Sequence, residues 1–242
     1  MKLYKEFFRY VIPSMLAFAL SGLYGIVDGF FLGNEMGDAA LAAINVAYPI
    51  TAFVQALGTG IGMGGAVQYT IHKAQKKTED AAKCLGLTLL LLFGSGAVIT
   101  PILLTMNIPM LKMLGLQGEL LALGNEYIVW IAWGTLFQIL GTGLVPFMRN
   151  LGNAYISTVA MVIGAMFNIV FDYLLIWVFH QGMKGAAIAS VMGQMAAFVI
   201  SIGYVLWKKE RIVIKRISVD LVKKILLVPV PHSDYPSRLI LR

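Results

Sequence analysis

The stretch MVIGAMFNIVFDYLLIWVF, residues 161–179, decides the fold of this chain. A continuous apolar run of about 20 residues is typical of a helix that crosses a membrane. Its only strongly polar side chains are Asn168 and Asp172. They are four residues apart, so a helix places both on one face. The stretch therefore predicts a membrane-spanning helix with an amide and a carboxyl group side by side.

The rest of the chain has the composition of an integral membrane protein. Of its 242 residues, 59% are hydrophobic and 13% are charged, whereas a soluble domain has about 25% charged residues. Six apolar runs are long enough to cross a hydrocarbon core of about 30 Å. They are residues 10–32, 44–69, 84–106, 127–148, 158–179 and 186–207. Because the runs are continuous rather than alternating, we expect helices and not barrel strands. The sequence predicts an all-α integral membrane protein, a bundle of six transmembrane helices.

The positive charges favour one orientation of this bundle. Of the 19 Lys and Arg residues, only Lys112 and Lys184 fall in the loops on one side, and the others fall on the opposite side. By the positive-inside rule the cation-rich side faces the cytoplasm. We therefore expect a multi-pass protein of the inner (plasma) membrane with both termini in the cytoplasm. The same distribution accounts for the net charge of +7 without a nucleic-acid partner.

Small residues recur in two of the expected spans. They form GTGIGMGGA at residues 58–66 and GAAIASVMG at residues 185–193. Small side chains let helix backbones approach closely in a membrane. No βαβ pattern surrounds the first of these stretches, so it is not a dinucleotide-binding loop. Both stretches predict helix-packing faces.

Two acidic residues inside the apolar runs, Asp28 and Asp172, are candidates for a functional site. A charge at the bilayer centre costs about 2.5–3.5 kcal/mol on insertion scales, so such a residue normally faces the bundle interior or an aqueous cavity. Burial favours the neutral acid and a nearby cation favours the carboxylate, so a carboxyl group between these influences can exchange a proton. Two simpler interpretations stay open. In the first, Asp28 lies at the membrane surface with its carboxylate hydrated. In the second, Asp172 is a buried, neutral packing residue that forms a hydrogen bond with Asn168.

The sequence contains no pattern of an enzyme or of a resident cofactor. The three histidines, His72, His180 and His232, lie far apart, and the single Cys84 excludes an internal disulfide. We find no nucleophile–base pair, phosphate loop in context or metal-ligand spacing. We therefore expect no enzymatic activity and no cofactor.

Four motifs, in their order and spacing, carry a family resemblance. They are LYGIVDGFFLGNEMGDAALAAINVAYP (23–49), GMGGAVQYTIHKAQKK (62–77), PFMRNLGNAYISTVAMVIGAMFNIVFDYLLIW (146–177) and GMKGAAIASVMGQ (182–194). From about residue 10 to 207 the chain resembles the N-terminal half of multidrug and toxic compound extrusion (MATE) transporters, most of all their MepA-like bacterial branch. The resemblance implies a fold of two six-helix lobes around a central cavity, of which this chain supplies the N lobe.

The resemblance also implies a function and a site. Such proteins export cationic amphipathic drugs by alternating access, driven by inward flow of H⁺ or Na⁺. In one branch, a cation site uses an aspartate of the first helix and an Asn-x-x-x-Asp pair of the fifth, which match Asp28, Asn168 and Asp172. These three residues would also be the ligands of Na⁺. A tyrosine of the fourth helix and a hydroxyl of the sixth match Tyr127 and Ser190, with serine where threonine is usual.

On the residues alone, the last two positions carry a weaker signal. Tyr127 lies near the end of an expected span, where aromatic side chains commonly anchor a helix at the membrane surface. Ser190 lies inside an expected helix, where serine usually bonds back to the backbone.

The length of the chain departs from the family pattern, which has twelve helices in about twice this length. We expect an N lobe at residues 1–207 and a basic cytoplasmic tail at residues 208–242. The end of this tail, PVPHSDYPSRLILR (229–242), resembles nothing expected there, so we interpret the tail as a truncated or frame-shifted start of the missing C lobe. The expected partners are membrane lipid, cationic drug-like molecules, and either a C-lobe chain or a second copy.

Two other functions stay open. A flippase of lipid-linked oligosaccharides, as in related families, would need a cationic cavity for pyrophosphate, whereas these spans contain acids. An inactive fragment or a non-transporting membrane subunit is the other alternative, because a lone lobe has half a cavity and nothing to move against.

Overall fold

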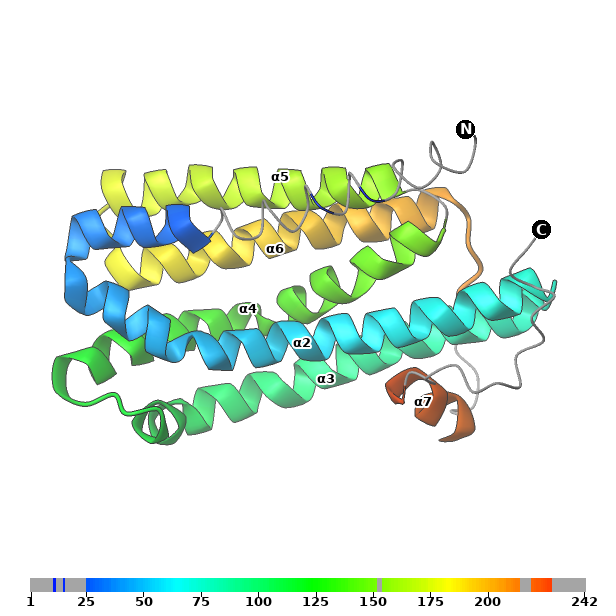
Figure 1. The fold of residues 1–242 in the computed structure, drawn as a ribbon, viewed down its shortest axis with the longest axis horizontal. Helices are drawn as coiled ribbons and strands as arrows, with labels where there is room; N and C mark the ends of the chain where they lie inside the picture. Colours follow the sequence, from blue (N-terminus) through cyan, green and yellow to red (C-terminus); the bar gives the residue numbers. More distant parts are fainter. Residues whose placement is uncertain (1–10, 12–14, 16–24, 152–153, 214–218, 228–242) are drawn as a thin grey trace.

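The helices of the chain lie along one another as an elongated bundle (Figure 1). The computed structural model describes residues 11, 15, 25–151, 154–213 and 219–227. The helices are α2 (Asp38–Ala74), α3 (Thr78–Met113), α4 (Gly118–Asn150), α5 (Ala154–Asp172), the π-helix η1 (Tyr173–Val178), α6 (Gly182–Trp207) and α7 (Val219–Leu226). Residues 25–36 are also helical and are called the N-terminal helix below. No strand occurs within these ranges, which confirms the all-α class.

Five helices are long and apolar enough to cross a membrane. They are α2, α3, α4, α5 continued by η1, and α6. Each contains one of the expected apolar runs almost completely, and most extend beyond it because polar residues continue the helix outside the apolar run. The expected first span, residues 10–32, lies mostly outside the described residues, as does the tail from residue 228. The structure therefore shows five spans and the helical end of the first run.

Charged residues mark the ends of the long helices. Acidic side chains occupy the first turns of α2, α3 and α4, and basic side chains occupy their last turns. This arrangement stabilises the partial charges that a helix carries at its two ends. Lys112, at the end of α3, and Lys184, at the start of α6, lie at the same end of the bundle, away from the other described cations (Figure 1).

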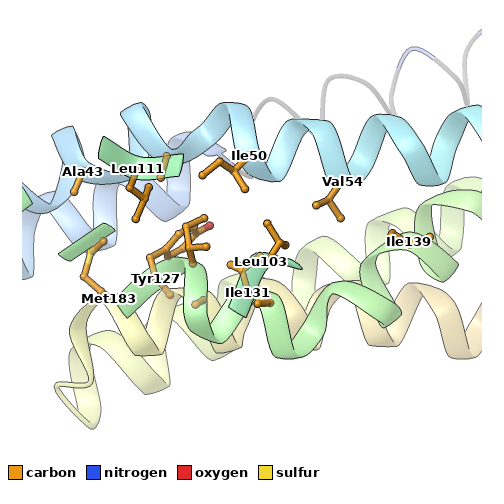
Figure 2. Packing of buried hydrophobic residues seen from close by; sticks show 14 of the residues in the cluster. Ala43, Ile50, Val54, Leu103, Leu111, Tyr127, Ile131, Ile139 and Met183 are labelled. Atoms are coloured by element: carbon orange, nitrogen blue, oxygen red, sulfur yellow. The ribbon is translucent and has the colours of Figure 1, made fainter. Parts of the chain in front are cut away.

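Helix α4 is the centre of the bundle. It packs against α2, α3, α5 and α6. In an apolar 18-residue stretch of α4, 61% is buried inside the structure, against 28% in the corresponding stretch of α3. Figure 2 shows the core between these helices, where Ile131 of α4 lies near Leu103 of α3 and below Ile50 of α2. Large apolar side chains on the outer face of α3, such as Phe93 and Met106, are exposed, as expected for a surface in contact with lipid tails.

Glycines allow the closest helix crossings. A Cβ atom added to Gly62 of α2 would overlap the backbone of Gly143 in α4, and one added to Gly65 would overlap Thr88 of α3. A Cβ on Gly193 of α6 would lie 2.7 Å from the carbonyl oxygen of Gly164 in α5. The two small-residue stretches are thus confirmed as helix-packing faces.

Candidate cation site

The fifth expected span places its two polar side chains inside the bundle. Asn168 and Asp172 lie one turn apart on α5, and both are fully buried. A close approach of α6 covers this face, since a Cβ on Gly193 would lie 3.1 Å from the Cβ of Asn168. The stretch therefore carries its amide and carboxyl groups toward the interior, as its spacing predicts.

Asp28, from the N-terminal helix, reaches the same place. It is 6% exposed, and its carboxyl group interacts with that of Asp172, although 144 residues separate them in the sequence. Asn168 also interacts with Asp172. The structure thus buries Asp28 instead of leaving it at the membrane surface, and it brings three of the expected site residues together.

Tyr127 and Ser190 complete the cluster. Tyr127 belongs to α4, is 6% exposed, and lies among the core residues in Figure 2. Its hydroxyl group interacts with Ser190 of α6 and lies within electrostatic range of both Asp28 and Asp172. The interpretation of Tyr127 as a membrane-surface anchor is therefore wrong, because its ring and hydroxyl group point into the bundle.

Several polar atoms of the cluster have no hydrogen bond of regular geometry to the described residues. They are Oδ1 of Asp28, both carboxyl oxygens of Asp172, and both amide atoms of Asn168. Buried polar atoms in proteins nearly always have a partner, so a group of five such atoms at one place needs an explanation. A set of carboxyl and amide oxygens provides ligands suited to a proton or to a hard cation.

The surroundings of the cluster supply no compensating positive charge. Among the described residues, Asp28 and Asp172 are the only buried charged side chains, and no Lys or Arg is buried. Two negative charges in close contact repel each other strongly where water is excluded. The cluster is therefore suited to hold added positive charge, either as a proton or as a metal cation with Asp28, Asn168 and Asp172 as ligands.

Two features beside the cluster were not predicted from the sequence. The first is η1, which begins immediately after Asp172. π-Helical turns are rare and frequently lie at functional sites. The second is a group of aromatic side chains in which Trp177 of η1 contacts Phe30 and Phe31 of the N-terminal helix, with ring centroids 6.2 and 5.0 Å apart. Hydropathy shows neither, because a π-turn has no distinct composition and the aromatic contacts join distant segments.

A polar contact closes the end of the bundle beyond these rings. His180 Nδ1 lies 2.6 Å from Oε1 of Glu35 and joins the residues after η1 to the end of the N-terminal helix. The carboxyl pair, the aromatic contacts and this polar contact thus all connect the same two segments. They fix the position of Asp28 relative to Asp172.

The fold and the cluster together define a helical, multi-pass membrane protein with an acidic site inside its bundle. Residues 13–174, more than half of the chain, match the MatE family. The chain therefore belongs to the MatE family, and the resemblance seen in its motifs is confirmed.

Two relatives illustrate the match and its extent. The chain is 28% identical over 241 residues to the multidrug export protein MepA of Staphylococcus saprophyticus, a match covering 98% of this chain and 52% of that protein. It is 27% identical over 204 residues to MepA of Staphylococcus aureus, covering 83% of this chain and 45% of that protein. The chain spans about half the length of the relatives it matches.

Solved structures show the same fold. One is an outward-facing multidrug resistance MATE family transporter of the MOP superfamily, with a TM-score of 0.81 and 25% identity; the match covers 90% of this chain and 49% of that chain. Another, from Pyrococcus furiosus, gives the same TM-score, identity and coverage. It is described as a MOP superfamily transporter whose binding pocket of reversed polarity suggests a different function.

Proposed function

We propose that this chain forms one half of a cation-coupled multidrug antiporter that exports cationic amphipathic compounds. The observation that carries the proposal is the buried, interacting pair Asp28 and Asp172, whose carboxyl oxygens lack regular hydrogen bonds and which has no buried cation beside it among the described residues. The relatives named multidrug export proteins support the drug-export part of the proposal.

In this mechanism the pair alternates between two charge states. With a proton or Na⁺ bound, the repulsion between the carboxyl groups of Asp28 and Asp172 is relieved and their segments stay packed together. Release of the cation leaves excess negative charge, which favours a cationic drug in a cavity next to the site. Asn168 ligates the cation and orients Asp172, while Tyr127 and Ser190 provide hydroxyl groups. Coupling requires that the cation and the drug prefer different conformations of the protein.

The complete transport cycle needs a second half. The chain corresponds to about half of its relatives, and alternating access is a movement of one bundle against another. We propose that a C-lobe chain or a second copy of this chain supplies the opposing wall. The cation-rich end of the bundle faces the cytoplasm of a bacterial cell, in the plasma membrane.

The charge of the interior favours this proposal over the flippase. A pyrophosphate-linked cargo requires buried cationic side chains, whereas the only charged side chains that the described residues bury are carboxyl groups. The inactive-fragment interpretation makes a different prediction, because a fragment would bind ions at the acidic site without moving drugs.

Ethidium efflux tests the proposal. The chain is expressed in drug-sensitive bacteria, alone and together with the C-terminal half of the S. saprophyticus MepA. We expect efflux when both halves are present and its loss in Asp172→Asn, because an amide cannot exchange a proton at that position. Asp38→Asn is the matched control, since Asp38 is exposed in the first turn of α2. Equal efflux by wild type and Asp172→Asn would contradict the proposed role of Asp172 in coupling. In a separate assay, flipping of a lipid-linked sugar by the chain would favour the flippase.

A further inference from the structure

The segment that follows α6 does not leave the bundle. It crosses the ends of α2 and α3 as residues 208–213 and then as α7, which Figure 1 shows beside α3. We call these two pieces, without residues 214–218, the docked segment. Its contacts with α2 and α3 occur at three points, and each point uses a different kind of interaction.

The first point is a polar clasp next to the end of α6. Glu210 accepts hydrogen bonds from the hydroxyl of Tyr69 and from Lys73 Nζ, both at 2.5 Å, and Lys73 also donates to the Tyr69 hydroxyl at 2.8 Å. Tyr69 is 2% exposed and its ring packs edge-on against Phe147 of α4. The clasp therefore ties the docked segment to a rigid part of α2.

The second point is a close backbone contact with α3. The backbone N–H of Val213 donates a hydrogen bond of 3.3 Å to the carbonyl oxygen of Ala82. The carbonyl group of Val213 lies against Gly86, one turn further along α3, where an added Cβ would overlap it. Only glycine at position 86 leaves room for this contact.

The third point is α7 itself. Its Ile225 is fully buried, Leu221 and Val222 pack against the core, and Lys223 and Lys224 on the other face are exposed. The backbone carbonyl of Ile225 lies against Gly64 of α2, and an added Cβ at Gly64 would overlap it. An amphipathic helix of eight residues is too short to be stable alone, so this packing is what holds it.

These contacts point to one conclusion about α2 and α3. We infer that the two helices form a docking groove for the docked segment, with Gly64 and Gly86 as its determinants, and that residues 208–213 and α7 move as part of this bundle. The glycines are informative because other glycines of the same helices, Gly60 in α2 and Gly94 in α3, have nothing within 4 Å of an added Cβ.

Hydrogen exchange of the purified chain in lipid nanodiscs tests the docking without any transport assay. In the wild type we expect protection of the Val213 amide and of α7 through Leu226. In Gly64→Ala and Gly86→Ala we expect these amides to exchange roughly tenfold faster or more, since a local contact of the folded state is opened. Gly60→Ala and Gly94→Ala are the matched controls and should exchange like the wild type, as should α4 and α6 in all variants.

A second pair of variants leaves the glycines of α2 and α3 unchanged, in case the alanine variants do not fold. Ile225→Asn should release α7, whereas Leu226→Asn, at a neighbouring exposed position, should not. Equal exchange in Ile225→Asn and Leu226→Asn would overturn the inference. So would rapid exchange of the Val213 and α7 amides in the wild type. Because these measurements require neither ion binding nor drug efflux, they test the docking independently of the proposed function.

Discussion

At the scale of single residues, the properties of the site depend on the side chains around two carboxyl groups. Asp28 and Asp172 interact with each other, Asn168 interacts with Asp172, and the Tyr127 hydroxyl lies within electrostatic range of both. No cation is buried among the described residues. An ordinary ion pair would neutralise such a group permanently. In the proposed mechanism, the charge of this cluster is instead balanced by a cation that binds and is released, as coupling to an ion requires.

The two hydroxyl groups of the cluster give a graded prediction. Tyr127→Phe and Ser190→Ala each remove one hydroxyl group of the proposed site, where a hydrogen bond to a charged group would contribute about 1.5–3 kcal/mol. We expect the affinity for the bound cation to fall by roughly ten- to a hundredfold in each variant. Ser190→Thr keeps the hydroxyl group and should bind like the wild type.

Isothermal titration of the purified chain with Na⁺, and with acid at constant ionic strength, measures these affinities. The prediction distinguishes a ligand role from a packing role, because Ser190→Thr changes volume and keeps the oxygen. If Ser190→Thr lost affinity as strongly as Ser190→Ala, Ser190 would act by its size and not by its hydroxyl group.

The clasp at Glu210 predicts a pH dependence of docking. Partial burial opposes the ionisation of Glu210, but the hydrogen bonds from Lys73 and Tyr69 outweigh it and hold the pKa of Glu210 below its usual value. A group with a lowered pKa stabilises the folded state above its unfolded pKa, and this contribution is lost as the pH falls through the folded value. The clasp should therefore be intact at neutral pH and should open only below the ordinary glutamate value of about 4.3.

Glu210→Gln tests this dependence by hydrogen exchange of the Val213 amide, compared with the wild type at each pH. We expect severalfold faster exchange in the variant at pH 7, because the charge-assisted hydrogen bonds are weakened. The two proteins should converge at strongly acidic pH. Glu119→Gln, at an exposed position in α4, is the control. A difference that persisted unchanged into strong acid would show that the carboxylate charge is not what holds the clasp.

At the scale of elements, hydropathy predicted which segments form helices, but it did not predict the residues at which the helices begin and end. Each of the five apolar runs within the described residues lies almost completely inside a helix, because a backbone in lipid can satisfy its polar groups only within a helix or a closed barrel. The helix ends lie several residues outside the runs in α2 and α3, where charged first and last turns continue them. The change from α5 to η1 after Asp172 leaves no trace in the apolar pattern.

The crossing of α5 and α6 supports the site and gives a prediction about stability. In Gly193→Ala the new methyl group would meet the backbone of Gly164 and the Cβ of Asn168. Overpacking of this kind costs about 1–3 kcal/mol. We expect a lower Tm in thermal unfolding for Gly193→Ala and a weaker cation affinity, since Asn168 must move.

Gly203→Ala is the matched control on the same helix, because nothing lies within 4 Å of a Cβ there. Alanine is a better helix former than glycine by up to about 1 kcal/mol, so this variant should be as stable as the wild type or slightly more stable. Equal Tm values for Gly193→Ala and Gly203→Ala would show that the crossing is looser than the structure indicates.

At the scale of the whole molecule, the sequence predicted the class of fold and the shared helix face of Asn168 and Asp172, but not how the distant residues of the cluster meet. The four-residue spacing placed Asn168 and Asp172 together, because that relation is local. The contact of Asp28 with Asp172 joins distant helices, so no local pattern contains it, and family resemblance alone suggested it. The docking of α7 could not be predicted either, since it depends on where the backbone of Ile225 passes Gly64.

We propose above all that the carboxyl cluster binds a proton or Na⁺ reversibly. Infrared difference spectroscopy of the purified chain tests this binding most directly. On acidification we predict a carboxylic acid C=O band that is present in the wild type and in Asp38→Asn and absent in Asp172→Asn. Na⁺ should move the appearance of this band to lower pH if it competes for the same site. Identical pH difference spectra for the wild type and Asp172→Asn, with no effect of Na⁺, would contradict the account.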